Sequence, residues 1–116
     1  ESARAAREFT RDHLDGLAES LLDTALLLTS ELVTNAVLHA RTPLQLTVEN
    51  NGRSIMLAVS DHDRMSPEER PQDAERLDGR GIALVAALSR EWGSVAHPAG
   101  KTVWCVLDTA PEHQRV

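Results

Sequence analysis

The stretch Asp23–Ala40 reads DTALLLTSELVTNAVLHA and is apolar around nearly its whole circumference. This pattern is typical of a buried helix. Asp23 is a suitable N-cap for it, and Pro43 marks its end because proline bars continuation. Glu31 and Asn35 are among the polar residues that interrupt the apolar surface. They stand four positions apart, so their side chains share one helix face.

This polar pair has two interpretations. A carboxylate among leucines is costly to bury unless a polar or ionic group lies opposite it. That cost favours a functional role, with Glu31 as a general base and Asn35 as a metal-binding amide. The alternative is a solvated stripe on a partly exposed helix. The helix alone leaves both interpretations open.

Shorter periodic segments flank this helix. An amphipathic helix is predicted from Ala3 to about Leu17. After the central helix, strand-like runs at Leu44–Glu49 and Ile55–Val59 enclose Asn50-Asn51-Gly52. Asn-Gly between two such runs is the strongest short-range signal for a β-hairpin.

The second half of the chain repeats the change from helix to strands. A third helix is predicted to follow Gly79-Arg80-Gly81 and to end near Glu91. Two last strands, about Gly93–His97 and Thr102–Leu107, are joined by the turn Pro98-Ala99-Gly100. Three helices with segregated strand pairs predict an α+β fold, a two-layer sandwich of helices on an antiparallel or mixed sheet.

Length and composition narrow the functional classes. The 116 residues suit a single domain, residues 1–116. A net charge of −6 disfavours a protein that binds a nucleic-acid backbone. The single cysteine, Cys105, excludes an internal disulfide framework and fits the cytoplasm. No apolar run approaches the roughly 20 residues that span a bilayer, so no membrane association is predicted.

Two further features suggest a ligand site. Asp61 ends a predicted strand beside the long polar loop His62–Asp78, where a carboxylate can accept hydrogen bonds from a ligand. Capping of a turn is the alternative. Gly79 and Gly81 open a helix, where exposed N–H groups and the helix dipole favour an anion such as phosphate. Glycine pairs open many helices, so this second signal alone is weak.

The order of four motifs is more specific than any one of them. ELVTNAVLHA, VSDHD, GRGIALVAAL and GKTVWCVL follow one another in residues 31–107. With this spacing the chain resembles the GHKL ATPases of the Bergerat fold over about residues 20–108. The wording of the first and third motifs is most similar to the anti-sigma-factor serine-kinase branch of that family.

The resemblance implies ATP and Mg²⁺ as cofactors, and it implies roles for individual residues. Glu31 matches the residue that polarises the attacking water or hydroxyl, and Asn35 matches the ligand of the magnesium that bridges the phosphates. Asp61 corresponds to the carboxylate that accepts a hydrogen bond from the adenine amino group. Thr102 matches a hydroxyl near adenine.

The resemblance also implies that the segment Gly79-Arg80-Gly81, the glycine loop, binds the phosphates. Gly79 and Gly81 match the phosphate-cradling glycines. Arg80 is positioned for a phosphate contact, with surface solvation as the alternative. The segment His62–Asp78 corresponds to the ATP lid.

The second motif departs from the family pattern. It normally runs Asp-x-Gly-x-Gly, whereas this chain has Asp63 and Met65 at the two glycine positions. Glycine permits backbone conformations and a close approach to adenine that other residues restrict. The substitutions therefore predict either weakened nucleotide binding or a reshaped pocket.

Two functions follow as hypotheses. The first is a cytoplasmic ATP-dependent protein kinase that phosphorylates a serine or threonine of a regulatory partner. The second is a degenerate module that binds nucleotide or sequesters a partner without kinase activity. The resemblance implies a sigma factor or an anti-sigma-factor antagonist as partner. It also allows a homodimer, although the strand that contributes to the dimer interface in relatives does not precede the first helix here.

Overall fold

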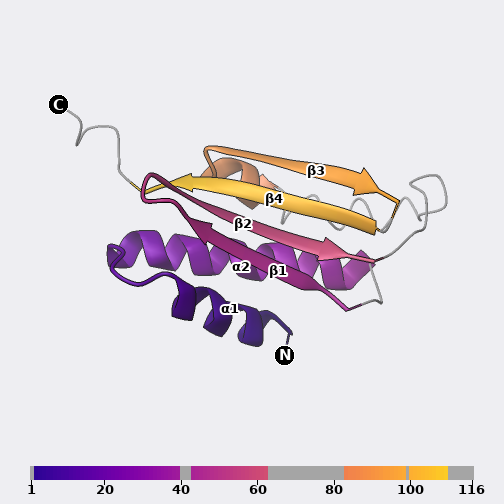
Figure 1. Ribbon diagram of the computed structural model, residues 1–116, viewed down its shortest axis with the longest axis horizontal. Helices are drawn as coiled ribbons and strands as arrows, with labels where there is room; N and C mark the ends of the chain where they lie inside the picture. The colour runs from indigo at the N-terminus through magenta and orange to yellow at the C-terminus, as the bar shows by residue number, and fades with distance from the viewer. Residues whose placement is uncertain (1, 40–42, 63–82, 99, 110–116) are drawn as a thin grey trace.

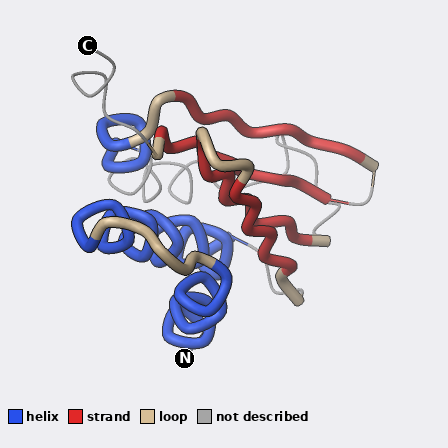
Figure 2. Tube along the Cα trace, turned by 60° about the vertical axis from the view of Figure 1, so that its left-hand side comes forward, coloured by secondary structure: helices blue, strands red, loops and turns tan. Residues whose placement is uncertain are grey.

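The computed structural model describes residues 2–39, 43–62, 83–98 and 100–109, and these form two layers. One layer is helical, with α1 (Ser2–His13), α2 (Glu19–His39) and a third helical segment at residues 83–88. The other is a sheet of β1 (Gln45–Asn50), β2 (Ser54–Asp61), β3 (Glu91–His97) and β4 (Gly100–Asp108). Figures 1 and 2 show the helices on one face of the sheet. The predicted α+β sandwich is confirmed.

The sheet has the strand order β1-β2-β4-β3, and all neighbouring strands are antiparallel. β2 and β4 are therefore the central strands and carry the inner face. Their inward residues pair directly across the sheet, as in Leu57 with Cys105 and Val59 with Val103. Because side chains alternate between the two faces of a strand, this register also fixes which polar residues face the helices.

The predicted β1–β2 hairpin is present. The N–H of Asn51 donates to the carbonyl of Ser54 at 3.1 Å, so Gly52 and Arg53 occupy the centre of the turn. Of the two, only Gly52 has a positive φ, of 91°. The Asn51 side chain supports the turn by accepting a hydrogen bond from the Arg53 N–H at 2.9 Å. The Asn-Gly signal found the turn, but its centre lies one residue later than the dipeptide.

Two predicted helix boundaries were wrong. α2 begins at Glu19, so Asp23 lies inside the helix and is not its N-cap. The N–H of Leu22 already donates to the carbonyl of Ala18, which starts the helical hydrogen bonding one turn earlier. α1 ends at His13 and not near Leu17, because the following Gly16 adopts a positive φ of 78°.

The third helix also ends earlier than predicted. Its described part covers residues 83–88, and Glu91 already belongs to β3. The N–H of Arg90 donates to the carbonyl of Val106 at 2.8 Å, which draws the chain into the sheet. The Arg90 guanidinium then binds the Asp108 carboxylate at 2.8 Å across the strands.

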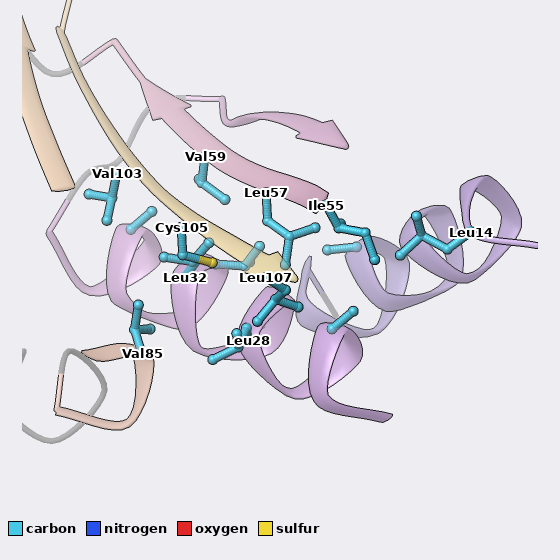
Figure 3. Close-up of a cluster of buried hydrophobic side chains, with 14 residues drawn as sticks. Leu14, Leu28, Leu32, Ile55, Leu57, Val59, Val85, Val103, Cys105 and Leu107 are labelled. Atoms are coloured by element: carbon cyan, nitrogen blue, oxygen red, sulfur yellow. The ribbon is translucent and has the colours of Figure 1, made fainter. Parts of the chain in front are cut away.

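The core lies between α2 and the inner face of the sheet (Figure 3). Leu28 and Leu32 of α2 meet Leu57 and Cys105, all at most 1% exposed. Val85 of the third helical segment closes the same cluster. The core is aliphatic, as the low aromatic content requires. In the described part of the chain, no helix is long and apolar enough to cross a membrane.

Cys105 is expected to make stability depend on alkaline pH. Burial raises the pKa of its thiol to about 11 from an ordinary value of 9.0, although the Ser89 side chain beside it acts in the opposite sense. The native state thus holds the thiol proton more tightly than the unfolded chain. The associated stability is complete below about pH 9 and is lost as pH rises through about 11. Denaturant titrations of the native protein should show a loss of about 2–3 kcal/mol over this range.

The matched variant is Cys105→Val, which replaces the thiol by an apolar side chain of similar size that suits a β-strand. Its unfolding free energy should lack this alkaline step. Identical pH profiles for the two proteins would show that the thiol does not contribute.

Candidate functional site

Asp61 is the last residue of β2 and is nearly inaccessible to solvent. Only 2% of it is exposed, although it is an acidic residue at a strand end. Its Oδ1 accepts a hydrogen bond from the backbone N–H of Lys101 at 3.1 Å. The same two residues are direct partners in the β2–β4 register. The sheet itself therefore fixes this carboxylate, and a buried carboxylate needs such partners.

Gly100 makes this arrangement sterically feasible. It opens β4 with a φ of 153°, and a Cβ at this position would overlap the backbone carbonyl of Asp61. Only glycine combines that conformation with so close an approach. The sequence pattern predicts a turn at Gly100 but does not indicate its contact with Asp61.

α2 contributes the second part of the site. Asn35 is 6% exposed and Glu31 is half-buried, on the same helix face. The C-terminal turns of α2 lie at the end of the sheet where β2 ends and β4 begins (Figure 1). The fold thus brings Asn35 and Asp61, which are far apart in sequence, to one end of the molecule, with Glu31 one helical turn further back.

Thr102 lies on the other side of the sheet. Its direct partner is Ser60, and the two hydroxyl oxygens are 2.8 Å apart. Thr102 Oγ1 is also 3.2 Å from His97 Nε2. Because Ser60 precedes Asp61 in β2, its side chain points to the face opposite the helices. The structure therefore places the Thr102 hydroxyl on the opposite face of the sheet from the Asp61 side chain and does not bring the two together.

The remaining predicted site residues fall outside the described ranges. These are Gly79, Arg80 and Gly81 of the glycine loop, and residues 63–78 of the expected lid. His62, the first residue of that segment, is described and exposed. Asp63 and Met65, which replace the family glycines, also lie outside the described ranges.

The side chains of the candidate site suit magnesium better than a metal ion that needs all of its ligands from the protein. Among the described residues, no group of three or more His, Cys, Asp or Glu side chains could hold a metal ion. Magnesium commonly takes one or two protein oxygens and completes its shell with substrate phosphates and water. The Asn35 amide oxygen is an oxygen donor of that kind.

An apolar groove lies at a different place, between α1, α2 and β1. It encloses about 550 Å³, and its lining includes Phe9, Val33 and Leu46 but no charged side chain. A triphosphate needs cationic or N–H donors, which this lining does not supply. The groove is therefore a poor candidate for a nucleotide site.

Comparisons with known proteins agree with this geometry. A family model described as "Histidine kinase-like ATPase domain" matches residues 1–107. A solved structure of the histidine kinase domain from the Erythrobacter litoralis EL346 blue-light-activated histidine kinase is 28% identical, with a TM-score of 0.55. The match covers 74% of this chain and 43% of that one, so this chain spans less than half of the neighbour's length. No curated protein matches the chain significantly.

Proposed function

The chain belongs to the histidine kinase-like ATPase domain family, and from this premise we propose that it is an ATP-dependent protein serine/threonine kinase. The observation that carries the proposal is the buried Asp61 carboxylate at the end of β2. It is an oriented hydrogen-bond acceptor at the end of the molecule where α2 contributes Asn35. The motif resemblance to anti-sigma-factor kinases supports a sigma factor or its antagonist as the protein partner.

Base recognition belongs to Asp61. One carboxylate oxygen is oriented by the Lys101 N–H, and the carboxylate accepts a hydrogen bond from the adenine amino group. Guanine carries a carbonyl oxygen where adenine carries this amino group. An acceptor would then face an acceptor in a buried site, so no hydrogen bond could form between the guanine carbonyl and the Asp61 carboxylate. The proposed site therefore prefers ATP to GTP.

Phosphoryl transfer requires a base and charge compensation. Glu31 accepts the proton of the partner's hydroxyl while that oxygen bonds to the γ-phosphorus and the bond to the β-phosphate oxygen breaks, releasing ADP. Asn35 would hold magnesium through its amide oxygen. When bound, magnesium neutralises the charge that develops on the phosphate oxygens. The remaining catalysis is positioning, as is usual in phosphoryl transfer.

Calorimetric titration with Mg-ATP, Mg-ADP and Mg-GTP tests the proposal. We expect both adenine nucleotides to bind and GTP to bind more weakly. Asp61→Asn should weaken ATP binding by about 5–150-fold, which corresponds to about 1–3 kcal/mol for a mispaired buried group. Thr102→Val is the matched control and should bind ATP like the wild type, because its side chain lies on the other face. Equal affinities for the wild type and Asp61→Asn would remove Asp61 from the site.

A partner-binding module without kinase activity is the second candidate. It is favoured by Asp63 and Met65, which replace the two glycines that normally follow the aspartate. No nucleotide binding at millimolar concentration would support this module. Phosphorylation of a captured partner would exclude it.

A further inference from the structure

Lys101 is the direct neighbour of Asp61 on the helix-facing side of the sheet. The two residues are register partners across β2 and β4. Lys101 has the same strand parity as the buried Val103, so its side chain leaves the sheet on the same face. Directly opposite side chains on one sheet face have Cβ atoms about 4.5–5.5 Å apart. The side chains that carry the Lys101 ammonium and the buried Asp61 carboxylate are therefore attached at adjacent positions on the same face of the sheet.

The two groups are nevertheless not joined as an ion pair. Asp61 Oδ1 is bonded by the backbone N–H of Lys101 and not by its ammonium. The ion pairs between described residues involve Arg90, with Glu91 and Asp108, and none includes Lys101. On its other side, Lys101 is paired with Ala96 of β3, whose side chain has no polar group. The half-buried Lys101 therefore carries a hydrogen-bond donor that the described fold does not use.

We propose that Lys101 determines base specificity by donating a hydrogen bond to adenine N1 while Asp61 accepts one from the adenine amino group. This inference rests on the proposed function. The adenine amino group is a donor, and the neighbouring N1 is an acceptor. The Asp61 carboxylate and the Lys101 ammonium offer the matching acceptor and donor from adjacent positions of the sheet. Guanine presents its carbonyl oxygen and its N1–H in the reverse order, so both contacts become repulsive.

A nucleotide that lacks N1 distinguishes a hydrogen bond from Lys101 to N1 from a contact between the Lys101 ammonium and another part of the nucleotide. Lys101→Met keeps the length of the side chain and removes the ammonium. We expect it to weaken Mg-ATP binding about tenfold or more, the usual effect of losing a charge-assisted hydrogen bond. In 1-deaza-ATP a C–H replaces N1, so the wild type should bind this analogue with a similar loss. Lys101→Met should bind the analogue as well as the wild type does.

Thr102→Val is the matched control, since its side chain is adjacent in sequence but lies on the other face. It should leave the affinities for both nucleotides unchanged. Equal ATP affinity for Lys101→Met and the wild type would overturn the inference. If Lys101→Met weakened the binding of ATP and of 1-deaza-ATP by the same factor, the inference would also be overturned. The ammonium would then act on a part of the nucleotide other than N1. A wild-type protein that binds no nucleotide would overturn the proposed function itself, which is a different result from either of these.

Discussion

Glu31→Gln is expected to lower phosphoryl transfer to the protein partner by about 10²–10⁴-fold, the usual contribution of a positioned general base. Glutamine keeps the shape of the side chain but cannot take up the proton of the attacking hydroxyl. Affinity for Mg-ATP should change little, because the proposed contacts to the nucleotide and its magnesium come from Asp61 and Asn35. Single-turnover transfer of labelled γ-phosphate to the partner measures the rate, and calorimetry measures the affinity.

Glu49→Gln provides the control for this variant. Glu49 is an exposed carboxylate on β1 and lies outside the site, so its amide variant should transfer phosphate at the wild-type rate. Transfer by Glu31→Gln at that same rate would show that the base assignment is wrong. A wild-type protein that binds its partner without phosphorylating it would favour the binding module.

Asn35→Ala is expected to remove the magnesium dependence of nucleotide binding. In the wild type, magnesium should tighten ATP binding at least tenfold, because in the proposed site the Asn35 amide oxygen and the phosphates would both bind the ion. Without the amide, ATP affinity should be nearly the same in magnesium and in a chelator. The phosphoryl-transfer rate should also fall. Alanine is a strong helix former, so α2 should remain folded.

Thr34→Ala is the matched control, since Thr34 is exposed and adjacent to Asn35 in α2. Its ATP affinity should keep the full magnesium dependence. If Asn35→Ala retains that dependence as well, magnesium is held by other residues.

Local signals in the sequence predicted the elements better than their ends. The hairpin was found because Gly52 must adopt a positive φ between two alternating runs. The start of α2 was missed because Asp23 is only one of several residues able to cap a helix. α2 instead begins one turn earlier, at Glu19, after Leu14 has entered the core beyond the end of α1.

The position of Asp61 at a strand end could be predicted from the sequence, whereas the sheet faces of Thr102 and Lys101 depend on the strand register. The sequence pattern identified Asp61 as a carboxylate at a strand end, and the structure shows that this carboxylate is buried. Thr102 and Lys101 are adjacent in sequence, and a shift of one residue exchanges their faces. The pairing of Asp61 with Lys101 resolves this choice, and Gly100 permits that pairing by its close approach to Asp61. The close approach becomes visible only when β2 and β4 are seen together.

Amide NMR spectra recorded during a Mg-ATP titration test most directly the claim that nucleotide binds where β2 ends and β4 begins. The amide of Lys101 is hydrogen-bonded to Asp61, so its signal should shift strongly, together with those of Asp61 and His62. The turn residues Gly52 and Arg53 lie at the opposite end of β2 and should not shift. Shifts confined to the apolar groove around Phe9 and Leu46, or no shifts at millimolar Mg-ATP, would contradict the claim.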